Sequence, residues 1–548
     1  MSRASVRLPL AGAAFLALAD TAIVALALPP ILRDLDTDVA GVAAVLGVYA
    51  VVLAVALPAA ELVRDRAGTR ITGCAGVCVF VVGSLVCGLS ESLGLLLAAR
   101  AVQGIGAAAV LVTAHTLLAT DVAGARAWRL ASLLGFAAGP ALGGALTQGF
   151  GWRSIFLLQA PAALAALPAA LTAGPEEPSR QRSVWTRHHL GRVVALALIS
   201  GAIAAALFLT VLLLIVGWGI EPLATAAAVS IMPLAALAVV RVHGPPLLRA
   251  GAGCLLVAAG TASLAFLPTA SVAWTILPQI AIGVGMGLSL PALAGELLPE
   301  RTGHDAARLL STRHVGIALA LLILAPIAQH EIDTTLVETE ERGAALILDA
   351  SIDPQLKLQI APELVDAVQT EDPRGGLDRV FDEHRSDVDE DQRAAYDELE
   401  NRSDETLVAG VNDGFATAFL VGAAFALLAA PALAPWTAVR RPALAGGLAV
   451  VALLAPAGYA LAAERERPEP VRIQDPCQDR DLPDSGGIAG ALQNAALVAL
   501  DQLACRAGSS REELVLAIAD EDAAKEYEER YDVDPRSIEN LADLVLPG

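Results

Sequence analysis

Long apolar stretches alternate with short polar connections along most of the chain. An α-helix needs about 20 consecutive apolar residues to cross the roughly 30 Å hydrocarbon layer of a bilayer. Thirteen stretches reach this length, and they lie near residues 8–32, 40–63, 70–90, 93–119, 127–149, 152–173, 192–217, 222–241, 247–268, 270–298, 309–330, 412–436 and 440–463. The pattern therefore predicts an all-α polytopic membrane protein.

Polar segments divide this predicted bundle into parts. The expected parts are an N-terminal six-helix half (1–173), a cytoplasmic linker (174–191), the first five helices of a C-terminal half (192–330), an acidic extracytoplasmic insertion (331–411), the last two spans (412–463) and an acidic extracytoplasmic domain (464–548). Both acidic segments contain amphipathic stretches between Pro and Gly breaks, which favour small helical domains. In the second, Ser510 and Glu513 fit a helix capping box.

The composition agrees with the apolar pattern. The chain of 548 residues is 55% hydrophobic and 17% charged, with a mean hydropathy of +0.59. Such a balance excludes a soluble multidomain protein of this length. Aromatic residues make up only 4%, and the abundance of small residues favours closely packed helices over a β-barrel, whose strands alternate every second residue.

The formal net charge of −21 is concentrated in the two acidic segments. Residues 331–411 hold 23 acidic and 7 basic side chains, and residues 464–548 hold 20 and 9. Nucleic-acid binding needs a basic surface, so this distribution argues against a nucleic-acid partner. The expected surroundings are the lipid bilayer and, for the acidic segments, an envelope protein partner.

Arginine residues indicate the orientation, because basic loops resist translocation. They collect in the connections after even-numbered spans, for example at Arg64, Arg66 and Arg126, whereas the odd short loops hold little beyond Arg33 and Arg153. We therefore expect a plasma-membrane protein with a cytoplasmic N-terminus and an extracytoplasmic C-terminus.

Two cysteines bear on the same question. Cys477 and Cys505 are the only pair in a polar segment. In an oxidising exterior they can close a disulfide, whereas in the cytosol they stay free thiols.

Three sequence stretches suggest a family. The second span ends in ELVRDRAGTR, the fourth opens with ARAVQGIGAAAV, and the fifth reads GFAAGPALGGALTQGFGWRSIF. In this order they resemble the motifs of the major facilitator superfamily, and the Gly-Pro run is similar to that of its drug/proton antiporters. The Asp-containing first span resembles the 14-span multidrug efflux subfamily. The resemblance implies a 6+6 helix bundle, here with one extra C-terminal span.

Two charged residues lie inside apolar spans. A carboxylate such as Asp20 costs about 2.5–3.5 kcal/mol at the centre of a membrane helix, so it must be paired, hydrated or protonated. Arg100 cannot discard its proton and requires a carboxylate, carbonyl groups or an anion. We expect Asp20 to carry a proton with Arg100 assisting. The alternatives are a structural acid and an arginine that reaches the nearer interface.

Two further sets of residues follow from the resemblance. The turn between spans two and three is expected to act as a gate that latches the two halves together on the inside; its residues are Asp65, Arg66, Gly68 and Arg70. A plain topology-setting loop is the alternative. The antiporter motif is expected to bend span five and to admit a neighbouring helix, because Pro removes a backbone hydrogen bond and Gly has no side chain; its residues are Gly135, Gly139, Pro140, Gly143 and Gly144.

Other polar residues in or near the spans are cavity candidates. They are Gln103, His115, Gln279, Glu296, Arg313 and His314. For His115 the alternative is a hydrogen-bonded core imidazole, and for Glu296 and Arg313 it is a position near the membrane interface.

The sequence contains no phosphate-binding loop, no zinc-type Cys/His spacing in a polar segment and no Gly-x-Ser-x-Gly elbow. We therefore expect no enzyme activity, no cofactor and no metal. The leading hypothesis is proton-coupled efflux of hydrophobic or amphipathic small molecules by alternating access. The alternatives are a transport-inactive scaffold that presents its acidic domains to an envelope partner, and a proton symporter for import.

Overall fold

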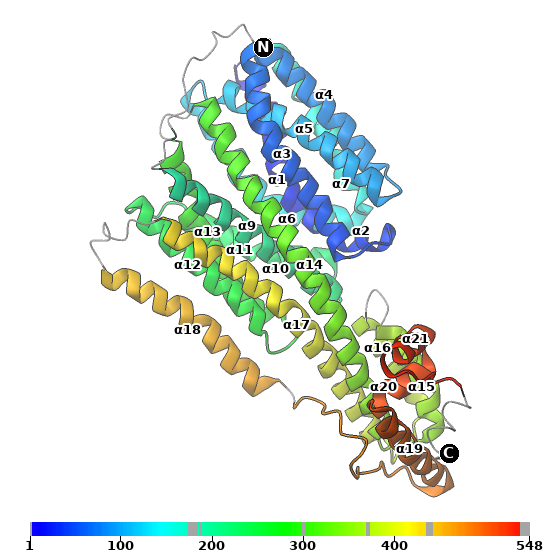
Figure 1. Ribbon diagram of the computed structural model, residues 1–548. Helices are drawn as coiled ribbons and strands as arrows, with labels where there is room; N and C mark the ends of the chain where they lie inside the picture. The colour runs from blue at the N-terminus through cyan, green and yellow to red at the C-terminus, as the bar shows by residue number, and fades with distance from the viewer. Residues whose placement is uncertain are drawn as a thin grey trace. The chain divides into compact units, whose positions relative to one another are not determined.

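The computed structural model describes residues 3–173, 185, 189–298, 302–368, 373–433, 442–467 and 469–537 (Figure 1). Within these ranges the regular elements are helices and no strand occurs. The predicted all-α class is confirmed. Most of the predicted linker 174–191 lies outside the described residues.

The chain forms two compact units. The first comprises Met1–Ile215, Ile220–Glu331 and Phe415–Arg465, and the second comprises Val216–Gly219, Ile332–Gly414 and Glu466–Gly548. Both acidic segments of the sequence thus fall in the second unit, because their polar residues cannot pack among membrane helices.

The N-terminal half of the first unit is a bundle of helices coloured blue to cyan in Figure 1. Its helices are α1 (Arg3–Ala25), α2 (Leu28–Asp34), α3 (Val39–Ala67), α4 (Thr69–Gly88), α5 (Leu93–Leu118), α6 (Val122–Phe150), α7 (Arg153–Leu164) and α8 (Leu167–Leu171). Side chains of Asp38, Ser92 and Asp121 cap the starts of α3, α5 and α6 by accepting backbone N–H groups. Within this half α1 packs on α6, and α5 packs on α3 and α4.

The C-terminal half follows the same pattern of apolar helices. Its helices are α9 (Leu190–Leu212), α10 (Pro222–Val229), α11 (Ile231–Val239), α12 (Pro246–Ser263), α13 (Val272–Leu297), α14 (Gly303–Asp349), α17 (Arg393–Ala432) and α18 (Pro442–Glu466). Here α13 packs on α11 and α12. The two halves meet where α6 packs on α10.

Twelve of the described helices are long and apolar enough to cross a membrane, or thirteen if the two parts of α6 count as one span. This count includes α19 (Gly487–Ala507), which the sequence analysis placed in the C-terminal polar domain. Among the described residues, α18 is not one of the helices counted. A helix nevertheless forms at each of the thirteen predicted spans.

Two helices are longer than the predicted spans. The spans 309–330 and 412–436 were expected to end at the acidic insertion, but α14 runs to Asp349 and α17 starts at Arg393. The physical reason is that the polar stretches next to each span contain no proline and are rich in helix-forming Ala, Leu, Glu and Arg, which outweigh the single glycine in each, Gly343 and Gly410.

The second unit has its own apolar core. Besides the ends of α14 and α17 it contains α15 (Pro354–Val368), α16 (Pro373–His384), α19, α20 (Arg511–Ala519) and α21 (Glu521–Tyr531). Ile352, Ile360, Phe381 and Tyr396 are buried in one cluster, and a smaller cluster joins α19, α20 and α21. The Ser510 half of the predicted capping box is confirmed, since the Ser510 hydroxyl accepts the Glu513 N–H at 2.9 Å. The Glu513 carboxylate instead accepts from Arg530 and Tyr531.

Covalent and ionic contacts fix the C-terminal part of this unit. Cys477 and Cys505 form a disulfide with a Cα–Cα distance of 5.0 Å. Next to it, the buried Arg480 donates to Asp501 at 3.2 Å and to Glu512 at 3.0 Å. These contacts tie the polar stretch before α19 to both α19 and α20.

Candidate functional site

Asp20 and Arg100 form an ion pair inside the N-terminal half. Asp20 lies on α1 and Arg100 on α5, and both are 0% exposed. The guanidinium donates from Nη1 to Oδ1 at 3.0 Å and from Nη2 to Oδ2 at 2.6 Å, which is the bidentate geometry that Arg favours with a carboxylate. The structure thus brings the two residues predicted for proton coupling into direct contact.

Two glutamines extend this pair into a network. Gln103 accepts a hydrogen bond from Arg100 at 2.5 Å and donates to Gln159 and to Ser84, each at 2.8 Å. Gln159 in turn donates to Asp20 at 3.3 Å. These hydrogen bonds form a closed ring that links Asp20 to side chains on α4, α5 and α7.

Aromatic and backbone groups complete the surroundings of Arg100. Its Nε donates to the carbonyl of Val45 at 3.1 Å, and its Cζ lies 4.3 Å from the ring centre of Tyr49 and 5.5 Å from that of Phe156. Tyr49 donates its hydroxyl to the carbonyl of Ala17 at 2.9 Å. A buried cation is stable only when it is paired and hydrogen-bonded in this way, and aromatic faces add attraction.

The glycines predicted on α6 face the helix that carries Asp20. A Cβ on Gly143 would lie 2.3 Å from the carbonyl oxygen of Ile23, and a Cβ on Gly139 would lie 2.7 Å from the Cβ of Ala22. At Gly135 the nearest atom would be a carbonyl oxygen of α1 at 3.2 Å. Only residues without side chains allow the two backbones this approach.

The other two motif residues have different surroundings. A Cβ on Gly144 would lie 2.4 Å from the Cβ of Ala226 on α10, so Gly144 faces the C-terminal half. The two parts of α6, Val122–Gly135 and Ala137–Phe150, are bent by 51°. Pro140 explains the bend, because it has no N–H to donate to the carbonyl four residues earlier.

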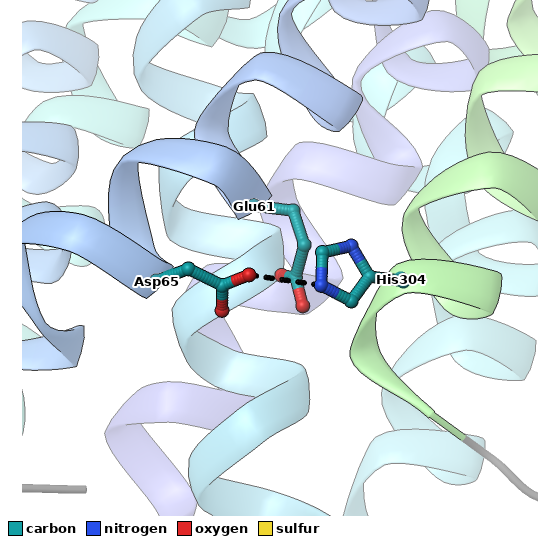
Figure 2. A group of neighbouring side chains, drawn as sticks. All are labelled: Glu61, Asp65 and His304. Atoms are coloured by element: carbon teal, nitrogen blue, oxygen red, sulfur yellow. Dashed lines mark hydrogen bonds and ion pairs between the residues drawn. The ribbon is translucent and has the colours of Figure 1, made fainter. Parts of the chain in front are cut away.

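A second charged cluster joins the two halves at the end of α3, and Figure 2 shows three of its members. His304 Nε2, from the start of α14, lies 2.9 Å from Asp65 Oδ2. Arg64 donates to Asp65 at 2.8 Å and to Glu61 at 2.7 Å. Nearby, the hydroxyl of Ser311 on α14 donates to a carbonyl of α3 at 2.6 Å. The predicted gate residue Asp65 thus contacts the C-terminal half.

The other predicted gate residues are placed differently. Gly68 separates α3 from α4 with φ +84°, a conformation that only glycine adopts without strain. Arg66 and Arg70 are exposed, and no ion pair to either occurs in the described part of the chain. Arg64, which the sequence analysis used only for orientation, is the arginine that holds Asp65.

The two halves also meet at the opposite end of the bundle. The Val39 N–H donates to Gln329 at 3.0 Å. Gln148 on α6 donates to Glu221 and accepts the N–H of Leu223, each at 2.9 Å. Both ends of the bundle therefore hold contacts between the halves.

The remaining cavity candidates do not gather at one place. His115 is buried with its ring centre 5.1 Å from that of Trp128. Glu296 pairs with Arg192 at 3.2 Å. The fully buried Gln279 on α13 donates to its own helix at 2.8 Å. Among the cavity candidates, and within the described part of the chain, only Gln103 is hydrogen-bonded to the Asp20–Arg100 pair.

Two further candidates lie side by side on α14. His314 is buried, with Nδ1 2.8 Å from the carbonyl oxygen of Leu310. Arg313 is half-buried, and its Nε has no hydrogen-bond partner within the described residues. Neither contacts Asp20 or Arg100 through a hydrogen bond in the described part of the chain.

The family follows from a match over more than half of the chain. The sequence profile of the Major Facilitator Superfamily matches residues 10–321. The chain belongs to this superfamily. The resemblance seen in the sequence is thereby confirmed, and the matched range contains Asp20, Arg100, the α6 glycines and the Asp65 turn.

Curated relatives match over part of their length. The chain is 36% identical over 154 residues to the drug efflux pump JefA of Mycobacterium tuberculosis, covering 27% of this chain and 30% of the relative. It is 34% identical over 241 residues to the cephamycin export protein CmcT of Amycolatopsis lactamdurans, covering 41% and 47%. The multidrug resistance protein Stp of M. tuberculosis is 36% identical over 27% of this chain and 29% of its own length. The matches thus span less than half of these relatives.

A solved structure supports the fold. A bacterial homologue of the human lysosomal transporter Spinster, in an inward-facing and occupied conformation, superposes with a TM-score of 0.51 at 18% identity. The superposition covers 78% of this chain and 97% of the other. At 18% identity this superposition shows that the two chains share a fold, and it carries no argument about substrate or mechanism.

Several residues of the two clusters were not singled out from the sequence. Gln159 interrupts an apolar span, and that position alone signals a buried polar contact. Glu61 is the first residue of the ELVRDRAGTR stretch and was given no role of its own. His304 carries no sequence signal, because its contact to Asp65 joins positions 239 residues apart.

Proposed function

We propose that this superfamily member exports hydrophobic or amphipathic small molecules across the plasma membrane and is driven by protons. The observation that carries the proposal is the fully buried Asp20–Arg100 pair. A scaffold has no need for a charged pair inside a membrane bundle, where each unpaired charge is costly. The similarity to drug efflux and export proteins supports the same class of substrate.

Protonation of Asp20 provides the coupling. The neutral acid no longer balances Arg100, so Arg100 turns toward Gln103 and the carbonyl of Val45, to which it already donates. The bidentate contact between α1 and α5 is then lost. Because the α6 glycines leave no side chains between α1 and α6, α1 can slide on α6 when this contact breaks.

Alternating access follows from the contacts at the two ends. The Asp65–His304 contact and the Ser311 hydrogen bond hold the halves together at one end, and the Gln329 and Gln148 contacts hold them at the other. Opening one end at a time exposes the interior to one side only. A ligand or proton drives the change only by binding one of the two states more tightly.

The proposed orientation places the Asp65 turn in the cytoplasm. Arg64, Arg66 and Arg70 lie at this turn, and cytoplasmic loops carry an excess of such residues. The disulfide between Cys477 and Cys505 supports an oxidising exterior for the second unit. Export then requires that substrate enters at the Asp65 end.

The test is proton-gradient-driven efflux from vesicles that contain the full-length protein. A panel of lipophilic cations, neutral drugs and envelope lipids is compared for the wild type and Asp20→Asn. We expect the Asn variant to fold and to lose gradient-driven efflux. Asp38→Asn is the matched control, because Asp38 caps α3 and asparagine caps a helix equally well.

A second variant guards against misfolding. Asp20→Asn leaves Arg100 buried without its carboxylate, which costs about 3–5 kcal/mol in comparable pairs. The double variant Asp20→Asn with Arg100→Gln removes both charges and should fold without driving efflux. Export by either variant at the wild-type rate with the same pH dependence would make Asp20 structural and would refute the coupling.

A further inference from the structure

Three potential metal ligands meet between the two halves. Glu61 and Asp65 lie one turn apart on α3, and His304 is the second residue of α14. One oxygen from each acid and one ring nitrogen lie within 4.8 Å of one another. Figure 2 shows the three side chains pointing toward one another from the two helices. Glu61 is 1% exposed, and the other two side chains are half-buried.

The position of the Glu61 carboxylate depends on a glycine. A Cβ on Gly303 would lie 2.3 Å from Oε1 of Glu61. A side chain at position 303 would therefore push the Glu61 carboxylate out of its present position. The sequence predicted no metal site, because the three ligands come from distant parts of the chain and do not have the spacing of a metal-binding motif.

We propose that Glu61, Asp65 and His304 bind a divalent transition-metal ion, with Zn²⁺ as the probe. Zinc accepts imidazole nitrogen and carboxylate oxygen at about 2.0–2.2 Å. Ligand atoms within 4.8 Å reach this geometry when the side chains close on the ion by small rotations. Two carboxylates and one neutral imidazole carry a charge of −2, which matches the ion.

A water can supply the fourth ligand. Glu61 lines a small cavity together with His115, Gly303 and apolar residues. The space open to a water-sized sphere is about 10 Å³, close to the minimum for one water molecule. A tetrahedral ion with three protein ligands and one water is the usual arrangement of an open zinc site.

Arg64 competes with the ion for the same oxygens. Its guanidinium donates to both oxygens of Glu61, at 2.7 and 3.2 Å, and to Asp65 at 2.8 Å. The ion must displace this guanidinium to bind. Replacement of Arg64 by an uncharged residue should therefore strengthen zinc binding, whereas loss of His304 should abolish it. These opposite effects separate a specific site from general attraction of cations to acids.

The expected effect of zinc on transport rests on the proposed function, whereas zinc binding itself does not. A bound ion would join α3 to α14 and hence one half to the other. It would hold this end closed, so zinc should inhibit efflux. If zinc binds but no efflux is measurable in any variant, the proposed function fails and the metal site stands.

The binding experiment uses purified full-length protein in detergent. Cys74 and Cys78 are replaced by alanine first, because they are free thiols one turn apart on α4. Zinc is titrated by calorimetry into this background, His304→Ala, Arg64→Gln and the control His243→Ala, whose histidine lies in an exposed loop. We expect one zinc ion per chain. His304→Ala should lower the zinc affinity at least about tenfold, because loss of a metal ligand costs more than loss of a group that only supports a ligand. Arg64→Gln should raise the zinc affinity.

Cobalt gives an independent readout. Co²⁺ at the site should show d–d absorption without the intense charge-transfer band of a thiolate, and zinc should displace it. Thermal unfolding of each variant without metal checks that it is folded, and Glu61→Gln serves in place of His304→Ala if the latter is not. Two results would overturn the proposal. One is equal zinc affinity of the cysteine-free background and of a folded variant that lacks a ligand, His304→Ala or Glu61→Gln. The other is that neither the background nor Arg64→Gln binds zinc.

Discussion

At the scale of single residues, the two charged clusters of the first unit differ in how they connect the bundle. Asp20 and Arg100 both belong to the N-terminal half. Asp65 and His304 belong to different halves. The first cluster can thus change shape within one half, whereas the second changes only when the halves move. This division suits a proton site and a gate, respectively.

A buried lysine gives the second unit a pH dependence. Lys357 on α15 is 7% exposed and donates to the carbonyl of Leu348 at 2.9 Å. Burial lowers the pKa of Lys357 from 10.5 to about 8, and the nearby Arg511 adds to this while Asp349 opposes it. Between pH 8 and pH 10.5 the unfolded chain therefore binds more protons than the folded one. Stability rises with pH in that window.

We predict that the resistance of the second unit to urea increases between pH 8 and pH 10, by up to about 3 kcal/mol as an upper bound. Lys357→Met keeps most of the apolar stem and should remove this increase. Pulse proteolysis of the full-length protein in urea, read from fragments of residues 332–414, measures it. An identical pH slope in the methionine variant would show that another group is responsible.

At the scale of elements, the contact between α1 and α6 depends on glycine at defined positions. Gly143 has a carbonyl of α1 where its Cβ would be, whereas Gly149 on the same helix has nothing within 4 Å. The two positions share a helix and a residue type, and they differ only in their neighbours. They form a matched pair for testing whether close approach is needed.

We predict that Gly143→Ala lowers the stability of the protein by about 1–3 kcal/mol, the usual range for overpacking, and impairs efflux. Gly149→Ala should be neutral or stabilising by up to about 1 kcal/mol, because alanine is the better helix former. Thermal unfolding in detergent and vesicle efflux provide the two readouts. If the two variants had equal stability and equal efflux, the close contact between α1 and α6 would not be needed for either property.

At the scale of the whole molecule, the assignment of α19 decides the topology. Its hydropathy of 1.3 is the lowest among the candidate spans. Asp501 on this helix pairs with Arg480, and Cys505 is bonded to Cys477. Arg480 and Cys477 lie in a polar segment, so placing α19 in the membrane would also bring this polar segment into the bilayer. We therefore assign α19 to the folded second unit and keep an odd number of spans.

We predict that reporters placed near Asp389 and after Gly548 are extracytoplasmic, and that thiol reagents on intact cells label neither Cys477 nor Cys505 without reductant. The bridge closes a loop over a separation of 28 residues, which stabilises the unit by about 3–4 kcal/mol in the chain-entropy model. Cys477→Ala with Cys505→Ala should lower stability accordingly. A cytoplasmic signal after Gly548, or rapid labelling of either cysteine in folded protein, would contradict this topology.

The sequence by itself determined the class of the protein and the positions of its helices. Apolar length decides where a chain can cross a bilayer, and helices form at all thirteen predicted places. A charged or polar side chain in such a span has to find a partner, so Asp20, Arg100 and Gln103 were identifiable without any contact being known. The α6 motif was identifiable for a related reason, because proline and glycine act through the backbone itself.

Only the tertiary structure decided which groups meet. Arg64, rather than Arg66 or Arg70, holds Asp65, because helical rotation turns the latter two outward. His304 reaches Asp65 because the start of α14 packs beside the end of α3, although the two residues are 239 positions apart. Contacts between distant segments depend on packing distances of a few ångströms, and a residue pattern along one chain does not encode them locally. The Asp65–His304 contact, and with it the group of residues proposed to bind a metal, could therefore be recognised only after the two halves were seen together.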